Sequence, residues 1–452
     1  MNRWLKFAAI FCVSIALSFG ATGQTNSLVW HKADGLVDAD IHGEPLLPLL
    51  RNISAQTGWH IFVEPGAAHI VSTTFKKLPT GAALKMLLGD LNFAFVPKAD
   101  TAPELYVFIT TMKNATRQVV VPAPAKHVPN QLLVKLKSGT DINALAKILG
   151  AKVTGHLDKY GVYRLEFADA SAADSALSQL QNNSDVQAVD YNYYFDPPPV
   201  AQGTSPGAGS SLSLQLNPPP DSGKTIVGLI DTSVNAQSLG SDAAQFILPQ
   251  INVADGASSD SGPTHGSAMA SLILQGIQGS TSGSTSVQIQ PVNVYGSSET
   301  TTSWDVAQGV QAAVNAGANI LNMSLGSTGD SSVLDAVLES AAKDGIVSFA
   351  ATGNTPMNAP YYPAADPGVI PVTALGQPGQ IASYANVWSD PIMIALPGTG
   401  EFFYGGQNWV VQGTSTSTAF ATGAFIGNMF THAWTPQQTI SAMEGHFTVP
   451  KQ

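Results

Sequence analysis

Five continuous apolar runs, separated by segments with helical spacing, strongly constrain the fold of the second half of this chain. A strand with one face in water alternates polar and apolar residues, whereas a strand of a parallel sheet, buried on both faces, is apolar throughout. The pattern predicts an α/β layout, with functional residues at the strand ends. The runs lie at residues 225–230, 287–294, 318–325, 345–351 and 368–375.

Polar residues stand where these runs end or where helices of small residues begin. Asp231 closes the first run, and His265 heads a small-residue helix. Asn354 follows the fourth run, and Ser415 opens a second such helix, with Ser417 as a rival hydroxyl inside it. Each residue alone fits a structural role such as a cap, so it is their ordered set that points to chemistry.

Five short motifs resemble those of the subtilisin family of serine proteases over about 215 residues. The intervals of 34 residues from Asp231 to His265, 89 on to Asn354 and 61 on to Ser415 are near the family's own. The resemblance implies a subtilisin-like three-layer sandwich with a mainly parallel sheet in residues 223–452, and a serine endopeptidase. The motifs are IVGLIDT, HGSAMASLI, ILNMSLG, AATGN and GTSTSTAFATG.

The resemblance assigns these residues to a catalytic triad and an oxyanion hole, and the roles are physically consistent. A serine hydroxyl is a weak nucleophile at neutral pH, so Ser415 needs His265 as its base. Asp231 would orient the imidazole and stabilise its charged form. The Asn354 amide, with the backbone N–H of Ser415, would stabilise the oxyanion formed when a peptide carbonyl is attacked.

The resemblance also implies where a substrate peptide binds. Ser324, Leu325 and Gly326 match the family's edge strand, which pairs with the peptide backbone and so tolerates many side chains. Tyr361, before a Tyr-Pro pair, matches the base of the first specificity pocket. If Tyr361 points inward, the pocket is shallow and prefers small side chains; the alternative places this ring in solvent or in the core.

Departures from the family pattern fall on supporting positions near His265 and Ser415, which bears on rate rather than on mechanism. The Gly/Ser/Thr-rich stretch between residues 277 and 287 lacks the Asn-rich loop that holds calcium in many relatives. Asp255 and Asp260 are candidate ligands for a cation such as calcium, but a pair of loop acids is usually solvated. We therefore predict no required metal and no cofactor.

The charge distribution divides the chain near residue 222. Residues 223–452 contain 14 acidic and 3 basic residues and no Arg, whereas residues 1–222 contain 17 of each sign. This balance argues against a nucleic-acid partner. It would suit an acidic medium, as in sedolisins, which share the Gly-Thr-Ser helix start. Sedolisins use a glutamate base and an aspartate in the oxyanion site, however, whereas this chain has His265 and Asn354.

Residues 1–23 have the pattern of an export signal, because Arg3 and Lys6 precede an apolar run over residues 7–19 and small residues follow it. A run of about 13 residues is too short for a stable membrane-spanning helix. The chain's one cysteine, Cys12, lies in this run, so the mature protein would have no thiol. We predict an exported protein, periplasmic or extracellular.

Residues 24–112 predict a small α+β domain, with helices at 46–57 and 80–88 in the order β-α-β-β-α-β. The stretches DADIHGEPLLPLLRNISAQTGWHIFVEP and TTFKKLPTGAALKMLLGDLNFAFV resemble the short N-terminal domain of secretins and TonB-dependent receptors. The resemblance implies contact with an envelope protein. The alternative is an ordinary α+β unit without a partner.

Residues 117–196 predict a second α+β domain, with helices at 142–149 and 172–181 among four strands. VPNQLLVKLKSGTDINALAKILGAKV and NNSDVQAVDYNYYF resemble the propeptide of subtilisin-family proteases, which implies an inhibitor whose last strand lies across the cleft. Residues 197–222, with two proline triplets, predict an exposed linker that is easily cut. We therefore expect a self-processed zymogen that acts on proteins or peptides and binds its own propeptide.

The competing hypothesis is a catalytically inert, subtilase-like scaffold that docks on an envelope complex through residues 24–112. The intact set of triad and oxyanion residues argues against it. The sequence contains no Gly-x-Ser-x-Gly elbow, no His-Glu-x-x-His helix and no Gly-x-x-x-x-Gly-Lys loop, so other hydrolase or nucleotide chemistry is not indicated.

Overall fold

The computed structural model describes residues 26–447, except 32–33, 65–66, 68, 99–100, 122, 204–215, 217–224, 255, 257–261, 282–285, 377–378, 389 and 391. The predicted export signal therefore lies outside the described residues. The chain divides into two compact units, Met1–Val119 and Val120–Gln452. The second unit contains the predicted protease domain and the predicted propeptide from Val120 onward, whereas residues 117–119, predicted to open the propeptide, belong to the first unit. Within the described ranges, no helix has the length and apolar character needed to cross a membrane.

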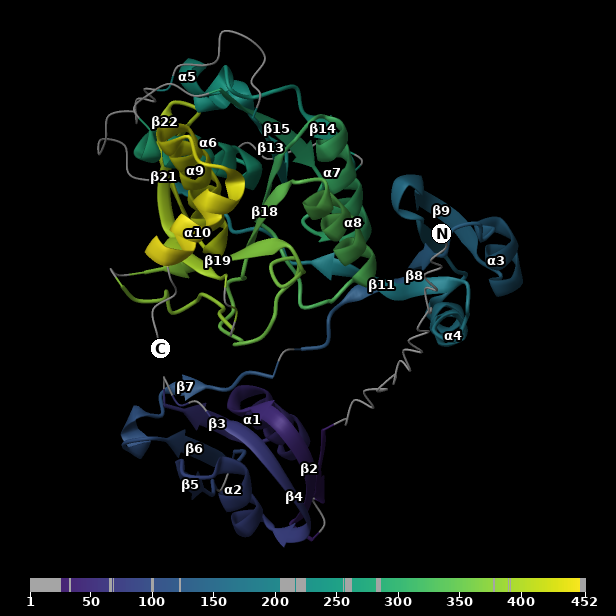
Figure 1. The fold of residues 1–452 in the computed structure, drawn as a ribbon, viewed down its shortest axis with the longest axis vertical. Helices are drawn as coiled ribbons and strands as arrows, with labels where there is room; N and C mark the ends of the chain where they lie inside the picture. Colours follow the sequence, from purple (N-terminus) through teal and green to yellow (C-terminus); the bar gives the residue numbers. More distant parts are fainter. Residues whose placement is uncertain are drawn as a thin grey trace, which may run out of the picture. The chain divides into compact units, whose positions relative to one another are not determined.

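The first unit contains two small sheets and two helices (Figure 1). Helices α1 (Leu46–Thr57) and α2 (Thr80–Leu88) match the predicted ones, and their buried leucines form the core. The predicted strand order is incomplete, because β1 (Ser27–His31) alternates exposed and buried residues and pairs with β2. The sheet orders are β1-β2-β4 and β5-β6-β3-β7, with β2 at Leu36–Pro45, β3 at His60–Val63, β4 at Ile70–Pro79, β5 at Asn92–Val96, β6 at Glu104–Phe108 and β7 at Arg117–Gln118.

An antiparallel sheet with two helices on one face forms the first part of the second unit, the prodomain. Strand β8 of this sheet is buried on both faces. Leu132 and Val134 pack against the helices, while Leu133 faces the opposite way into a core shared with the protease domain. The predicted elements are confirmed to within four residues. They are β8 (His127–Leu136), α3 (Ile142–Leu149), β9 (Lys152–Leu157), β10 (Val162–Glu166), α4 (Ala170–Leu180) and β11 (Val186–Phe195).

A seven-stranded parallel sheet forms the centre of the protease domain, in the order β14-β15-β13-β17-β18-β19-β20. The five predicted strands are confirmed, whereas the short edge strands β14 and β20 were not predicted, because two to four residues carry little periodic signal. The strands are β13 (Thr225–Asp231), β14 (Ile251–Asn252), β15 (Val287–Asn293), β17 (Ile320–Met323), β18 (Val347–Ala351), β19 (Val369–Leu375) and β20 (Ile394–Pro397).

Helices cover both faces of this sheet, which gives the predicted three layers (Figure 1). Helices α6, α9 and α10 lie on one face, and α7 and α8 lie on the other. A short helix α5 precedes β14. The bounds are α5 (Ser241–Ala244), α6 (His265–Ser280), α7 (Ser303–Asn315), α8 (Ser332–Lys343), α9 (Thr414–His432) and α10 (Pro436–His446).

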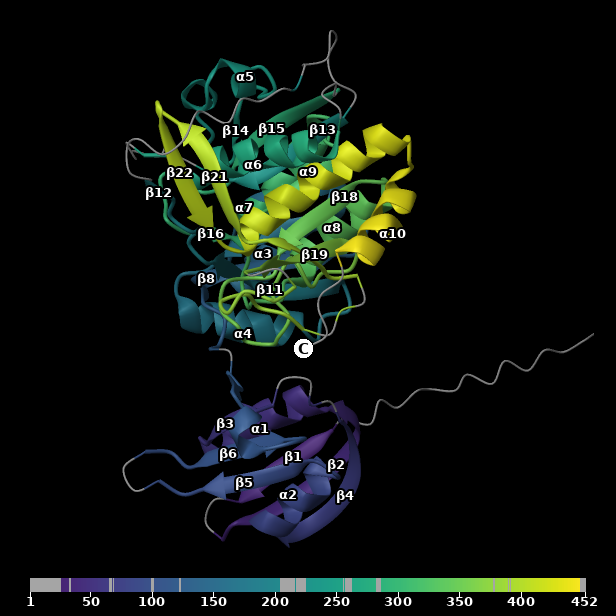
Figure 2. The same cartoon turned by 90° about the vertical axis from the view of Figure 1, so that its left-hand side faces the viewer.

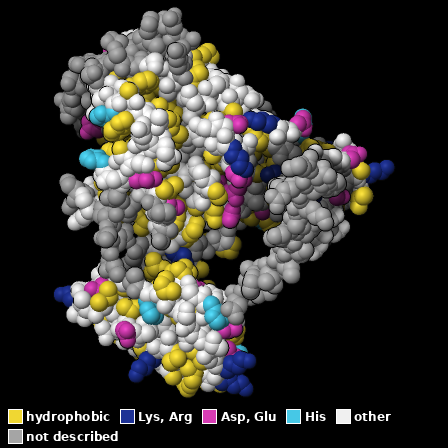
Figure 3. All heavy atoms as spheres, in the orientation of Figure 1, with side chains coloured by type: hydrophobic (Ala, Val, Ile, Leu, Met, Phe, Trp, Pro, Cys, Tyr) yellow, Lys and Arg dark blue, Asp and Glu magenta, His cyan; other side chains and the backbone are white. Residues whose placement is uncertain are grey.

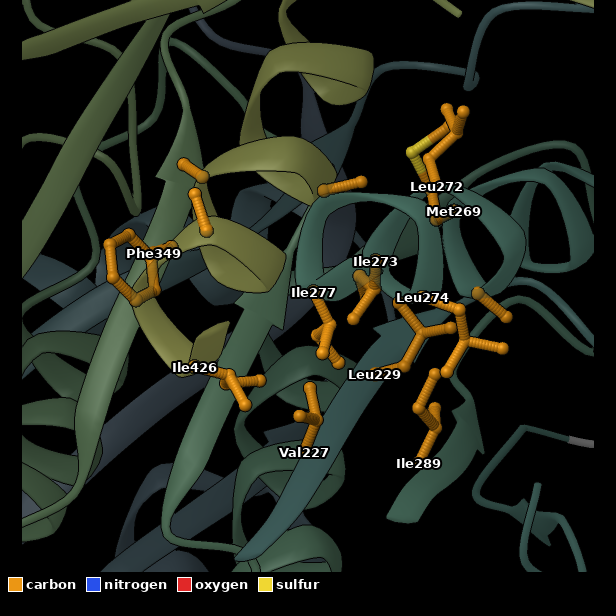
Figure 4. Close-up of a cluster of buried hydrophobic side chains, with 14 of the residues drawn as sticks. Val227, Leu229, Met269, Leu272, Ile273, Leu274, Ile277, Ile289, Phe349 and Ile426 are labelled. Atoms are coloured by element: carbon orange, nitrogen blue, oxygen red, sulfur yellow. The ribbon is translucent and has the colours of Figure 1, made fainter. Parts of the chain in front are cut away.

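The larger core lies between the sheet and helices α6 and α9 (Figure 4). Val227 and Leu229 of β13 point toward Ile273 and Ile277 of α6. The two helices approach closely: a Cβ on Gly423 would lie 2.3 Å from the Ile273 carbonyl oxygen. Small residues in the middle of both helices therefore allow α6 and α9 to pack closely against one another.

A hairpin of β21 (Thr399–Tyr404) and β22 (Gln407–Gln412) lies beside the sheet and receives a short strand, β12 (Gln202–Gly203) (Figure 2). The predicted exposed linker, residues 197–222, is exposed at β12 but is wrong at Leu216, which is 5% exposed in the protease core. Moving an apolar side chain out of water stabilises the folded protein. This stabilisation holds Leu216 in the core although its neighbours in the sequence are mostly polar. The remaining linker residues, apart from 197–201, lie outside the described ranges.

Candidate active site

A carboxylate and an imidazole lie in contact at the carboxyl end of the sheet. Asp231 is the last residue of β13, and His265 is the first residue of α6. The Nδ1 of His265 lies 2.8 Å from Asp231 Oδ1 and 3.0 Å from Oδ2, and both side chains are buried. Because a carboxylate only accepts, Nδ1 carries the proton and Nε2 keeps a lone pair for use as a base.

The loop after β13 holds this pair in place. The Thr232 N–H donates to Asp231 Oδ1 at 2.7 Å, and Thr232 Oγ1 accepts from the Gly266 N–H at 2.8 Å. A Cβ on Gly266 would lie 2.3 Å from the Thr232 carbonyl oxygen. The glycine after His265 therefore lets the start of α6 approach β13 closely enough for the imidazole to reach the carboxylate.

Ser415 lies in the first turn of α9 and is 3% exposed. Its Oγ donates to the Ser324 carbonyl oxygen at 3.0 Å. The Nε2 of His265 is buried and has no hydrogen-bond partner among the described residues. The structure thus places Ser415 beside the predicted substrate strand, with its proton directed to Ser324 rather than to the histidine.

Ser417, the rival hydroxyl, faces away from this site. Its Oγ donates to the carbonyl oxygens of Leu396 and Pro397, at 3.0 and 3.1 Å. These acceptors belong to β20, a strand that supplies none of the other candidate residues. Ser415 is therefore the hydroxyl that the fold presents to the cleft.

Asn354 is held by the residue before the candidate nucleophile. Its Oδ1 accepts from the Thr414 N–H at 2.8 Å and from Thr414 Oγ1 at 3.1 Å. The same Oγ1 accepts from the Gly353 N–H at 3.1 Å. With Oδ1 committed to two donors, the Nδ2 group of Asn354 remains as the donor for an oxyanion.

Tyr361 is buried rather than solvent-exposed, and it combines both sequence-based alternatives, since it belongs to a core cluster with Met357 and Ala359 and also lines the cavity beside Ser415. It is 6% exposed, and a Cβ on Gly326 would lie 2.2 Å from its ring. Its hydroxyl lies 2.9 Å from the Gly326 carbonyl oxygen and 2.5 Å from Asp196 Oδ2. Burial raises the pKa of Tyr361 well above its ordinary value, so the phenol stays protonated and donates.

A cavity of about 340 Å³ connects these groups. Ser415, Asn354 and Tyr361 line it together with the predicted substrate strand. The predicted strand residues that line it are Ser324, Leu325 and Gly326. Ser324 also acts through its side chain, since its Oγ donates to the Ser415 carbonyl oxygen at 3.1 Å.

Sequence reasoning missed Thr232 and Thr414, which hold the predicted site residues in place. Thr232 follows Asp231 and donates to its Oδ1, whereas Thr414 precedes Ser415 and donates to Asn354 Oδ1. Their position next to Asp231 and Ser415 was the available signal, because a buried carboxylate or amide needs more than one partner.

The two candidate calcium ligands, Asp255 and Asp260, lie outside the described residues. Within the described residues, no three His, Cys, Asp or Glu side chains are grouped so that they could hold a metal ion. The prediction that the enzyme requires no metal remains a prediction.

The fold and the site together define a subtilisin-type serine protease architecture. Residues 222–443 match the model of the Subtilase family, and residues 113–192 match the model of the fervidolysin N-terminal prodomain. Subtilisin Savinase from Lederbergia lenta is 30% identical over 187 residues, which are 39% of this chain and 69% of that protein. This chain belongs to the subtilase family, a family of serine endopeptidases.

Other relatives match parts of the chain. Thermostable alkaline protease from Halalkalibacterium halodurans is 40% identical over 120 residues, which are 26% of this chain and one third (33%) of that protein. Subtilisin NAT from Bacillus subtilis subsp. natto is 26% identical over 309 residues, 63% of this chain and 77% of the relative.

Two solved structures support the fold alone. Fervidolysin from Fervidobacterium pennivorans aligns with a TM-score of 0.56 at 18% identity, covering 71% of this chain and 57% of that one. A variant of the epidermin leader peptide processing serine protease from Staphylococcus aureus aligns with a TM-score of 0.51 at 16% identity, covering 69% and 92%.

Proposed function

We propose that this chain is a serine endopeptidase that hydrolyses peptide bonds through an acyl-enzyme on Ser415. The observation that carries the proposal is the buried contact of 2.8 Å between His265 Nδ1 and Asp231, which orients an available Nε2. When the Ser415 hydroxyl turns to this nitrogen, Nε2 takes its proton as Oγ attacks the carbonyl carbon. The proton then passes to the leaving amine, and water hydrolyses the ester.

The developing oxyanion would be stabilised by neutral donors. Asn354 supplies its Nδ2 group, and Ser415 supplies a backbone N–H at the N-terminus of α9, where the helix dipole favours negative charge. The substrate would extend along residues 324–326 by backbone pairing. Support for that mode comes from Gly326, whose carbonyl oxygen already accepts an N–H from Asp196 at 3.0 Å.

Trypsin offers a way to test the activity, because the basic residues are so unevenly distributed. Residues 223–452 contain three Lys and no Arg, whereas residues 1–222 contain 17 basic residues. Limited digestion should therefore cut the prodomain at its basic residues up to Arg164 and detach residues 165–224 by a cut after Lys224, while largely sparing the protease domain. After trypsin is blocked with a trypsin-specific inhibitor, we expect a serine-directed phosphonate to label Ser415 and peptides to be hydrolysed.

Two alanine variants provide the matched pair for this test. Ser415→Ala should lose labelling and nearly all hydrolysis, since the triad acts as a unit, while Ser417→Ala should keep both. Failure of the digested wild type to label or to hydrolyse peptides would favour the inert scaffold instead.

The remaining parts of the proposal concern location and contacts. We propose that residues 1–23 direct export, to the periplasm or beyond the cell, and that residues 24–112 contact an envelope protein. Support comes from the signal pattern and from the sequence resemblance to the short N-terminal domain of secretins. We also propose that catalysis needs no metal, which activity unchanged by a chelator would test.

A further inference from the structure

The residues that follow the prodomain lie across the candidate active site. β11 ends by pairing with β16 (Thr301–Thr302), where Phe195 lies opposite Thr301. The next residue, Asp196, donates its N–H to the Gly326 carbonyl oxygen at 3.0 Å. The triplet 197–199, all proline, then lines the same cavity as Ser415, and the chain continues to β12.

This segment also borders the histidine. A second cavity, of about 690 Å³, is lined by the same triplet together with His265, and by Trp409 of β22. A Cβ on Gly413 would lie 3.3 Å from Pro199. The triplet therefore separates the base from the substrate wall, in the place that a substrate would occupy.

The backbone pairing determines which residue faces the candidate nucleophile. In an antiparallel pair, moving two residues forward on one strand corresponds to moving two residues back on the other. If the hydrogen bond from Asp196 to Gly326 continues as an antiparallel pair, residue 198 comes opposite Ser324, and both residues line the same cavity. Any other amino acid would offer its N–H to the Ser324 carbonyl oxygen, but Pro198 has none.

Ser415 takes the place of that missing donor. Its Oγ donates to the Ser324 carbonyl oxygen at 3.0 Å, while His265 Nε2 has no partner within the described residues. Pro199 adds a second obstacle, because its ring carbon replaces the amide hydrogen and adds bulk at the nitrogen that the histidine must approach to deliver a proton. Ser415 and His265 are thus both present, but the Ser415 hydroxyl is not hydrogen-bonded to His265 Nε2.

We propose that Pro198 and Pro199 make residues 195–199 a substrate-like plug that Ser415 does not cut, so that the intact chain is latent. The proposal rests on the proposed function, since an inert serine needs no restraint. It places the activating cut outside residues 195–199, and it makes release of the prodomain together with its plug the step that frees the cleft.

The test compares two proline pairs in the full chain. In the double variant Pro198→Ala/Pro199→Ala, Ser324 gains a backbone donor and Ser415 can turn to His265. Its Oγ then forms an ester with the carbonyl of residue 198 as the 198–199 bond breaks. The amine of residue 199 leaves with the proton that His265 took from Ser415, and water releases the new carboxylate. The control is Pro218→Ala/Pro219→Ala, in the other triplet of the same chain.

We expect the purified wild type and the control variant to keep the 198–199 bond. The Pro198→Ala/Pro199→Ala variant should cut it at least about 100-fold faster, a typical cost of a misplaced reacting group, and show a new N-terminus at residue 199. Adding Ser415→Ala should abolish that cut. A wild-type N-terminus at residue 199 would overturn the proposal. So would an uncut double variant whose trypsin-digested form hydrolyses peptides.

A second measurement covers the case in which the double variant does not fold. Trypsin-digested wild type is offered two synthetic peptides, YFDPPPVAQ and YFDPAAVAQ. We expect cleavage of the second after its first alanine and no cleavage of the first. Equal cleavage of both would refute the plug, whereas a digested enzyme that neither labels at Ser415 nor cuts any peptide would refute the proposed function and the plug with it.

Discussion

Two buried carboxylate arrangements in the protease domain have opposite surroundings. Asp231 is 1% exposed and accepts hydrogen bonds from Thr232 and His265. Asp366 is 4% exposed, and the side chain that it hydrogen-bonds is another carboxyl group, that of Asp335. Burial raises the pKa of Asp366 well above its ordinary value and raises the pKa of Asp335 to about 6.

The difference shows that a buried carboxyl group stays ionised only where its surroundings supply hydrogen-bond donors. A buried charge is stable only with donors around it, and otherwise the group takes up a proton. Lys and Arg side chains are few over the protease domain on the face drawn in Figure 3, in keeping with three Lys and no Arg in residues 223–452. Asp231 is supplied with donors by its own loop and by α6, whereas the Asp335 and Asp366 pair depends on protons.

Replacing each carboxylate by its amide gives the largest expected contrast. Asp231→Asn should lower kcat of the trypsin-digested enzyme by about 10,000-fold, because an amide favours the wrong imidazole tautomer. Asp366→Asn removes an equally buried carboxyl group and should leave kcat unchanged. The kcat of both variants is measured on a chromogenic peptide. Similar decreases in kcat would contradict the different roles assigned to Asp231 and Asp366.

The amide of Asn354 is the neutral donor that we expect to stabilise the negative charge of the oxyanion, and its replacement tests this role. Asn354→Ala should lower kcat by about 100- to 1,000-fold, a range known from a subtilisin, which is a member of this family. Thr414→Val removes one of the two hydrogen bonds that hold Asn354 and should cost about tenfold or less. If the valine variant were as impaired as the alanine variant, Thr414 would have a larger role than holding the amide.

Tyr361 is a buried phenol that stays neutral and lines the cavity beside Ser415, where we expect it to limit the first specificity pocket. Tyr361→Gly should raise kcat/KM for peptides with a bulky residue before the cut bond by about 10- to 200-fold relative to alanine there. Tyr361→Phe keeps the ring and should keep the preference for small residues. A peptide library in which the wild type already prefers bulky aromatic residues would contradict this assignment.

The smallest expected effect concerns stability against pH. The folded pKa of Asp335, about 6, lies above its ordinary value of 3.8, so its stabilising contribution is complete below about pH 4 and is lost as pH rises through 6. In a Ser415→Ala background, the free energy of unfolding should fall between pH 4 and 7. Asp335→Asn should make this fall smaller by about 1 to 2 kcal/mol, after allowing for solvent screening.

Thermal unfolding across this pH range is the measurement for Asp335. Asp242→Asn is the control, because Asp242 lies on the surface and its removal should leave the slope unchanged. An unchanged slope in the Asp335 variant would mean that the pair is already ionised in the folded protein.

The central strands and the helices around the site could be predicted because their signals are local. The apolar run ending at Asp231 and the small residues after Ser415 are visible in the sequence itself. Leu216 and the edge strand β20 could not, because their burial depends on surfaces that distant residues build. The burial of Tyr361 could not be predicted either, because it depends on Gly326, which leaves room for the ring.

The sequence by itself determined the order of elements and which residues, Asp231, His265, Asn354 and Ser415, were available for chemistry, since chain order and hydrophobic periodicity are local properties. The tertiary structure decided how they are engaged. Asp231 meets His265, but Ser415 donates its proton to Ser324. That choice depends on the strand opposite, where residue 198 offers no N–H, and such pairing exists once the chain has folded back across its own cleft.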